Sequence, residues 1–200
     1  MKRLVVALFG VLIVMLFIMP AMAEDQLVPD ERARIPEGGI DTQSPVLDGS
    51  AFTNYDTFFV HGTFAEAEGY SDVVSDYDFG YGRYTTVRYG PGAFIDCTIP
   101  SYEKKTGGVQ PQVRYLAIYY ESDGTNPKIK TIDIFNGPNL VKTISYSSPL
   151  YSSGYTIQII DLGGWYTFNR GLNMAMQVAN DDPTNNWTFR IAGYGARFEW

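Results

Sequence analysis

Leu172-Asn173-Met174-Ala175-Met176-Gln177-Val178 places a large apolar side chain at every second position. Successive side chains of a β-strand point to opposite faces of its sheet, so the leucine, both methionines and the valine would share one face. Two amides and an alanine would occupy the other face. The stretch therefore predicts a strand with one face packed on a core.

Short runs rich in Tyr, Phe, Ile, Val and Thr recur along the chain and predict further strands. Turn-forming residues separate them, as in Ser122-Asp123-Gly124. No helical periodicity persists over a window of about eleven residues. We expect about nine or ten short strands, which predict an all-β antiparallel sandwich of the jelly-roll or Greek-key type. The runs are residues 57–62, 84–89, 94–99, 113–121, 129–135, 141–146, 155–160, 172–178, 187–192 and 195–200.

Residues 1–23 have the three regions of a secretory signal peptide. Lys2 and Arg3 precede an apolar run from Leu4 to Met19, and a small-residue site ends at Ala23. About 16 apolar residues fall short of the roughly 20 that cross a bilayer, so cleavage after Ala23 is predicted, with an uncleaved anchor as the alternative. Both alternatives predict a secreted or cell-surface protein, with membrane contact only through this segment.

Residues 24–50 contain no aromatic residue and are rich in Pro, Glu, Asp and Gly. This composition is typical of a flexible polar spacer. From Ala51 onward the aromatic and β-branched runs begin, so residues 51–200 are predicted to form a single domain.

The chain is acidic, with 22 Asp+Glu against 15 Lys+Arg and a net charge of −7. Signal cleavage would remove two of the basic residues and make the charge more negative. Binding to nucleic-acid phosphates requires clustered cations, so this class of partner is excluded.

Cys97 is the only cysteine and His61 the only histidine. Cys97 alternates with two isoleucines, which predicts a buried, inert thiol, and one cysteine cannot form an intramolecular disulfide. A Ser-His-Asp triad or a transition-metal site would need partners that one histidine and one cysteine do not supply. His61 is therefore predicted to be structural, beside a close backbone approach at Gly62. No catalytic residue and no cofactor is predicted.

Two carboxylates keep an enzymatic alternative open. Asp96 and Asp133 fall on predicted strands, each on the face opposite its aliphatic neighbours. Glycoside hydrolysis needs two carboxyl groups roughly 5 to 10 Å apart across a cleft. The sequence does not show whether these strands are adjacent, and ordinary outward-facing charges are the simpler interpretation.

Asp76-Tyr77-Asp78-Phe79-Gly80, with Asp72 upstream, is a weak candidate for calcium because its carboxylates alternate before a glycine. The other ligands of a calcium loop are absent from the segment. It is therefore predicted to be a polar turn, and no metal site is predicted.

Fifteen tyrosines make the chain rich in aromatic residues, which can stack on sugar rings and donate a hydroxyl. Cross-strand packing is the alternative use of such residues in a sheet. Asn186-Trp187-Thr188 also matches the glycosylation acceptor pattern. The aromatic candidates for ligand binding form two groups, Tyr81, Tyr84 and Tyr89, and Tyr151, Tyr155, Trp165 and Tyr166.

Several segments, taken in order, resemble an uncharacterised family of secreted β-sandwich proteins known as a domain of unknown function. The resemblance implies a sandwich fold and supplies no catalytic or binding residues. The segments are Val60-His61-Gly62-Thr63, Ile99-Pro100, Ile132-Asp133-Ile134-Phe135-Asn136-Gly137, Gly171-Leu172, Gly193, and Gly195-Ala196-Arg197-Phe198.

The absence of a recognisable catalytic set favours a non-catalytic exported module for surface binding or envelope structure, with a glycan or surface polymer as partner. Two alternatives stay open. One is a carboxylate-based carbohydrate-active enzyme, which the fold permits without favouring. The other is a protein that assembles into a surface layer.

Overall fold

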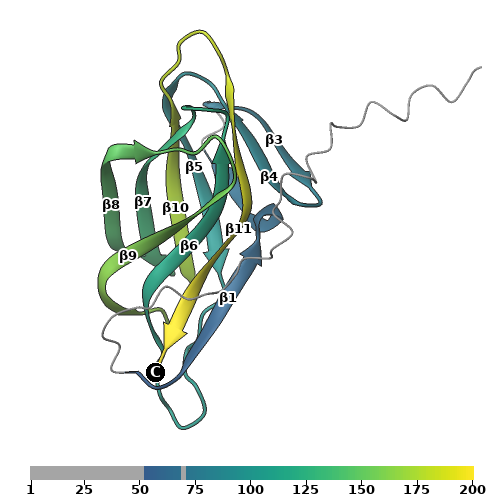
Figure 1. The fold of residues 1–200 in the computed structure, drawn as a ribbon. Coiled ribbons are helices and arrows are strands. Elements are labelled where there is room, and N and C mark those ends of the chain that lie inside the picture. The colour runs from purple at the N-terminus through teal and green to yellow at the C-terminus, as the bar shows by residue number, and fades with distance from the viewer. Residues whose placement is uncertain (1–51, 69–70) are drawn as a thin grey trace, which may run out of the picture. The chain divides into compact units, whose positions relative to one another are not determined.

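The structure is a computed structural model that describes residues 52–68 and 71–200. These residues form two antiparallel sheets that face each other, which confirms the predicted all-β sandwich (Figure 1). The predicted signal peptide, residues 1–23, and the whole of the predicted spacer, residues 24–50, lie outside the described residues. No helix in the described ranges is long and apolar enough to cross a membrane. The strands are β1 (Tyr55–His61), β2 (Glu66–Glu68), β3 (Val73–Phe79), β4 (Gly82–Val87), β5 (Gly90–Ile99), β6 (Gln112–Ser122), β7 (Lys128–Asn136), β8 (Asn139–Leu150), β9 (Thr156–Thr167), β10 (Leu172–Asn180) and β11 (Trp187–Glu199).

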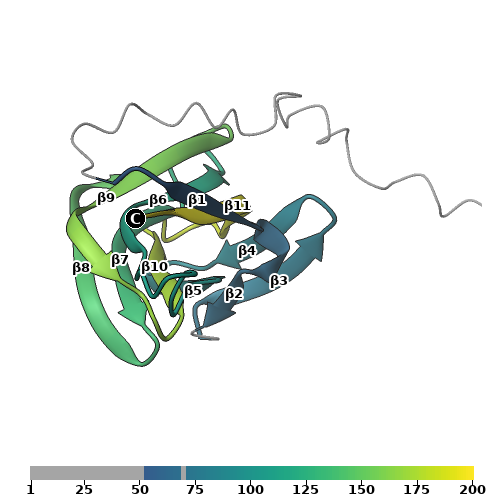
Figure 2. The same cartoon turned by 90° about the horizontal axis from the view of Figure 1, so that it is seen from below.

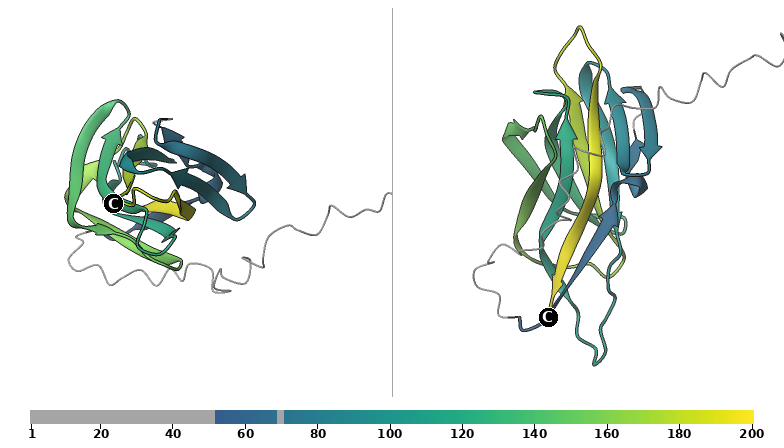
Figure 3. Two further views of the ribbon diagram at one scale, coloured as in Figure 1. Left: turned by 90° about the horizontal axis from the view of Figure 1, so that it is seen from above. Right: turned by 45° about the vertical axis from the view of Figure 1, so that its right-hand side comes forward.

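One sheet has the strand order β3-β4-β11-β6-β9, and β1 pairs with the C-terminal half of β11. The other sheet has the order β2-β5-β10-β7-β8. Figure 2 shows the two layers end on, and Figure 3 shows β11 running beside β6. Strands β10 and β11 therefore lie inside their sheets, with neighbours on both sides.

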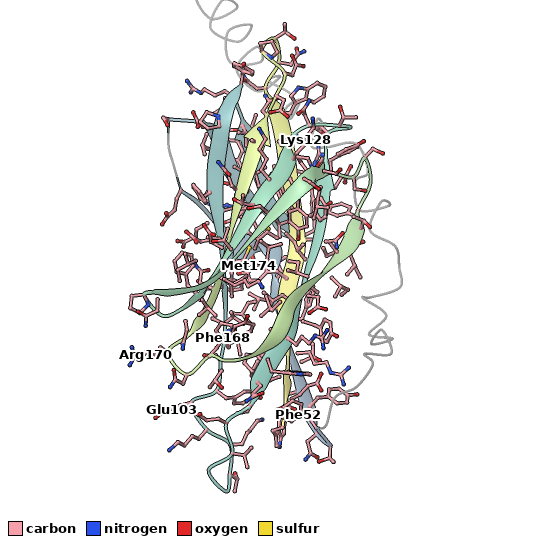
Figure 4. All side chains as sticks on the ribbon, turned by 90° about the vertical axis from the view of Figure 1, so that its left-hand side faces the viewer. Phe52, Glu103, Lys128, Phe168, Arg170 and Met174 are labelled. Atoms are coloured by element: carbon pink, nitrogen blue, oxygen red, sulfur yellow. The ribbon has the colours of Figure 1, made fainter. Side chains whose placement is uncertain are left out.

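The core lies between the sheets and is built from alternate residues of each strand. Leu172, Met174, Met176 and Val178 of β10 have no exposed surface, as their alternation predicted. Side chains of the opposite sheet pack against them, including Phe189 and Tyr194 of β11. Figure 4 shows Met174 among the side chains that fill this space. Burying a large apolar side chain stabilises the fold by about 1.5–3 kcal/mol.

All ten predicted strands fall on observed strands, with two differences. Residues 187–192 and 195–200 belong to one strand, β11, whose register shifts between Ile191 and Gly193. The sequence pattern also missed β2 and β3. Strand β2 has three residues, and β3 carries Ser75, Asp76 and Asp78, so neither shows a simple apolar alternation.

His61 and Cys97 have the structural roles that the sequence predicted. The Nδ1 atom of His61 accepts a hydrogen bond from the backbone N–H of Thr63 at 3.4 Å and caps a 3₁₀ turn, η2 (Gly62–Phe64). Cys97 is fully buried, and this burial raises the pKa of its thiol well above the ordinary value. Because the thiolate is the reactive form of cysteine, the side chain is an inert part of the core.

Gly62 lies against the backbone of β11, which confirms the predicted close approach. A Cβ atom at this position would lie 1.8 Å from the carbonyl oxygen of Ile191. That separation is far inside a van der Waals contact, so only glycine fits between η2 and the register shift of β11.

Gly62→Ala should therefore lower the free energy of unfolding by about 1–3 kcal/mol or more, because the methyl group forces backbone apart. Urea denaturation of the purified protein measures the loss. Gly80→Ala is the matched control, since a Cβ there meets no atom within 4 Å. Equal stability of the two variants would contradict the close approach.

Candidate functional site

The central strands of the five-stranded sheet bring Asp96 and Asp133 into one row on its outer face. Ala175 of β10 lies opposite Asp96 of β5 on one side and opposite Asp133 of β7 on the other. Neighbouring strands lie nearly 5 Å apart, so the two aspartates are separated by about 10 Å at the backbone. The structure thus places on one row the two carboxylates that the sequence could assign only to separate strands.

Two phenylalanines stand diagonally across the same alanine. Phe94 of β5 lies opposite Gln177, and Phe135 of β7 lies opposite Asn173. Each position is two residues from an aspartate on its own strand, so aromatic and acidic side chains share the outer face. Phe94 keeps 37% of its surface exposed.

The small side chain of Ala175 forms the floor of a groove between these taller neighbours. The groove has a volume of about 430 Å³. Its outer rim includes Glu68 of β2, and its far end includes the turn between β7 and β8, where Gly137 has a φ of 55°. The lining residues are Glu68, Phe94, Asp96, Asp133, Phe135, Gly137, Pro138, Asn173 and Ala175.

Neutral hydrogen-bond donors hold the polar side chains of this face in place. Asn173 Nδ2 donates to Asp96 Oδ1 at 2.7 Å, and the Thr143 hydroxyl donates to Asp133 Oδ1. In the next row, Gln177 Nε2 donates to the carbonyl oxygen of Pro91 at 3.0 Å. The carboxylates are therefore oriented by neighbours that leave their negative charge in place.

The carboxylates that line the groove have no basic partner in the described part of the chain. Elsewhere on the described surface, Asp161 pairs with Arg114 at 3.0 Å and Asp181 with Lys130 at 2.8 Å. No salt bridge within residues 52–68 and 71–200 involves Glu68, Asp96 or Asp133. The negative charge of Asp96, together with a hydrogen bond between the two groups, raises the pKa of Glu68. The groove therefore presents uncompensated negative charge to a ligand.

The predicted tyrosine groups are arranged differently from the prediction. Tyr84 is buried, with 8% of its surface exposed, so its predicted role as a stacking surface is wrong. Its ring packs edge-on against Tyr81, and its hydroxyl lies 3.3 Å from that of Tyr155, which joins the two groups into one cluster. Tyr166 packs against the core.

The other aromatic candidates lie away from the groove. Trp165 packs against Phe52 and Tyr115, while Tyr89 and Tyr151 are exposed. None of the seven predicted aromatic residues, all of which the structure describes, lines the groove. The aromatic residues that do line it, Phe94 and Phe135, are not among the predicted residues, because the composition singles out tyrosine. The signal was present, since each stands two residues from an aspartate already placed on the outer face.

The weak calcium candidates are not arranged as a ligand set. Asp76 and Asp78 lie on β3, so the predicted polar turn is wrong, and both accept hydrogen bonds from Arg83 of β4. The side chain of Asp72 lies near Gly90 instead. Within the described ranges, no group of three or more His, Cys, Asp or Glu residues could hold a metal ion. Asn186 is exposed just before β11, and its glycosylation stays a prediction.

Comparison with solved structures finds β-sandwich domains at low sequence identity. The carbohydrate-binding module CBM36 in complex with calcium and xylotriose is 11% identical, with a TM-score of 0.40 over 68% of this chain and 97% of that chain. A family 35 carbohydrate-binding module from Clostridium thermocellum is 13% identical, with a TM-score of 0.39 over 70% and 97%. The low-affinity xylan-binding module CBM86 from Roseburia intestinalis is 13% identical, with a TM-score of 0.42 over 72% and 96%.

No family model and no curated protein matches the chain, so the family resemblance seen in the sequence is not confirmed.

Asp96→Asn should return the pKa of Glu68 toward its ordinary value of 4.5, because the charge of Asp96 is the main cause of the shift. Carbon-13 NMR titration of the side-chain carboxyl groups measures this directly. In the unmodified chain, the pKa of Glu68 is higher in the folded state than in the unfolded state, so protonation of Glu68 stabilises the fold at acid pH. This stabilisation is lost as the pH rises through the raised pKa.

Asp133→Asn serves as the control for this titration, since Asp133 lies on the far side of Ala175 and should leave the Glu68 pKa raised. An unchanged Glu68 pKa in Asp96→Asn would show that the two carboxyl groups do not interact.

Proposed function

We propose that the domain is a non-catalytic glycan-binding module in which an extended sugar chain lies in the groove across β5, β10 and β7. One observation carries the proposal: Phe94 and Phe135 stand diagonally across a floor of Ala175, with Asp96, Asp133 and Asn173 between them. Sugar rings have apolar C–H faces and polar hydroxyl edges. Aromatic rings suit the faces, and carboxylates and amides suit the edges.

The hydrogen bonds within the groove favour binding because they fix the polar side chains in advance. Asp96 is held by Asn173, and Asp133 by Thr143. A side chain that is already ordered loses less conformational entropy when a ligand arrives, and each immobilised side chain otherwise costs about 0.5–1.5 kcal/mol. The groove is thus prepared to accept hydroxyl donors from a sugar.

The charge of the groove restricts the class of glycan. Three carboxylates line it, and none has a basic partner within the described ranges. Like charges brought together in a partly enclosed site repel each other, which disfavours uronic acids and sulfated sugars. The ligand is therefore a neutral glycan or one that carries amino groups. A signal peptide and spacer in residues 1–50 would place the domain outside the cytoplasm, where such polymers are accessible.

A carboxylate-based enzyme is the second candidate, and Glu68 is the observation that favours it. A carboxylic acid with a raised pKa beside an ionised carboxylate is the arrangement of a general acid and its partner. Against it, Glu68 is exposed on the three-residue strand β2. Asp96 and Asp133 are separated by about 10 Å at the backbone, at the wide end of the range for glycoside hydrolysis. Binding without hydrolysis therefore explains the groove better.

Isothermal titration calorimetry against soluble neutral, amino-bearing and uronic-acid oligosaccharides tests the proposal. Phe94→Ala and Phe135→Ala should each weaken binding of a neutral or amino-bearing ligand about three- to tenfold, because each removes an aromatic contact worth roughly 0.5–1.5 kcal/mol. Ala175→Met should weaken binding further by filling the floor without changing charge. Tyr77→Ala, an exposed aromatic on the other sheet, is the control and should bind normally.

Tight binding that survives the double Phe94→Ala, Phe135→Ala substitution would place the ligand elsewhere, with the exposed Tyr89 and Tyr151 as the next candidates. Preference for a uronic-acid polymer would contradict the charge argument. Release of shortened oligosaccharides that Glu68→Gln abolishes would favour the enzyme instead.

A further inference from the structure

The β2 end of the groove is more acidic than its lining residues alone show. Glu66 of β2 lies opposite Asp96 of β5 in the strand register, and Glu68 lies opposite Phe94. Ala67, between the two glutamates, packs against the core, so both glutamates stand on the outer face beside the groove. Three carboxylates therefore stand around the aromatic ring of Phe94. We call Glu66, Glu68 and Asp96 the acidic end of the groove.

The carboxylates of the acidic end repel one another. The charge of Asp96 and a hydrogen bond with it raise the pKa of Glu68, and the charge of Glu66 raises it further. None of the three forms a salt bridge in the part of the chain that the structure describes. A cation placed among them would relieve the repulsion, whereas a neutral hydroxyl group carries no charge to offset it.

The opposite end of the groove has a basic neighbour instead. Gly137 lines this end, and a Cβ atom added there would lie 3.0 Å from the Cβ atom of Arg170. The backbone N–H of Arg170 donates to Asn136 Oδ1 at 2.9 Å, which fixes Arg170 beside the turn between β7 and β8. Negative charge is therefore concentrated at the β2 side of the groove.

Two further features beside the acidic end suit an ammonium group. Phe94 keeps 37% of its surface exposed, and the face of an aromatic ring attracts cations. The Oδ1 atom of Asn173 is buried and accepts no hydrogen bond among the described residues, although Nδ2 of the same amide donates to Asp96. A buried acceptor without a donor costs stability, and an N–H group of a ligand that reaches it would satisfy it.

We propose that the groove binds a glycan with free amino groups, one of which lies at the acidic end against the ring of Phe94. This inference rests on the proposed glycan-binding function and names the class of sugar within it. An ammonium group donates charge-assisted hydrogen bonds to carboxylates, and these are roughly twice as strong as neutral ones. No group of three or more His, Cys, Asp or Glu residues in the described ranges could hold a metal ion, so an organic cation fits this position better than a metal does.

Isothermal titration calorimetry of the purified protein with two hexasaccharides tests this inference. A glucosamine hexamer and an N-acetylglucosamine hexamer share one backbone and one length, and differ only in the acetylation of their amino groups. At about pH 6, where free amino groups are protonated, the glucosamine hexamer should bind at least about tenfold more tightly. Raising the ionic strength should reduce this difference, because salt screens charges near the surface.

Glutamine substitutions test the position of the amino group. Glu66→Gln combined with Glu68→Gln removes two charges and keeps the size of both side chains. In this variant the preference for the glucosamine hexamer should fall to less than about threefold, because most of the charge that holds the ammonium group is lost. Glu103→Gln is the matched control, since Glu103 is an exposed carboxylate in the loop after β5 and does not line the groove (Figure 4). It should keep the full preference.

Each other outcome contradicts a different step. Equal binding of the two hexamers to the unmodified chain would overturn this inference and leave the glycan-binding function standing. A preference that persists in the double glutamine variant would overturn the position assigned to the amino group. Hexalysine that binds as tightly as the glucosamine hexamer would overturn the inference in favour of a basic peptide. Failure of both hexamers and of neutral oligosaccharides to bind would contradict the proposed function, and this inference with it.

Discussion

Burial of one face of β10 is the constraint on which the rest of the structure depends. Leu172, Met174, Met176 and Val178 have no exposed surface, so a shift of this strand by one residue would turn four large apolar side chains toward water. At about 1.5–3 kcal/mol for each side chain, the cost exceeds the whole stability of many domains. The register of β10 against β5 and β7 is therefore fixed by the core.

The same register positions the groove. Because the apolar residues of β10 face inward, Asn173, Ala175 and Gln177 must face outward. The residues paired with them on β5 and β7 face outward as well. Ala175 is then flanked by Asp96 and Asp133 as a direct result of strand pairing. The core thus determines where the carboxylates and phenylalanines of the groove stand, although it lies on the other face of the sheet.

The strands could be predicted because the alternation of apolar residues is visible within each short segment. The groove could not be predicted because it depends on which strands pair with one another. Asp96 and Asp133 were both placed outward from the sequence, but nothing in the sequence shows that β10 lies between them. Strand β3 was missed because Asp76 and Asp78 are paired with Arg83 from the next strand, so its polar residues are satisfied inside a sheet rather than in a turn. Tyr84 was misjudged for a similar reason, since neighbouring strands and the Tyr155 hydroxyl cover it.

The carboxylates of the groove have different neighbours from the carboxylates that form salt bridges. Asp161 and Asp181 are paired with basic side chains, which lower the pKa of each carboxyl group. Glu68 and Asp96 instead repel each other, and the fold tolerates this repulsion at neutral pH without a compensating lysine or arginine in the described ranges. Stability alone would favour a basic residue at this position. Asp96 and Asp133 are instead oriented by the neutral donors Asn173 and Thr143, and the proposed binding of sugar hydroxyl groups rests on this arrangement.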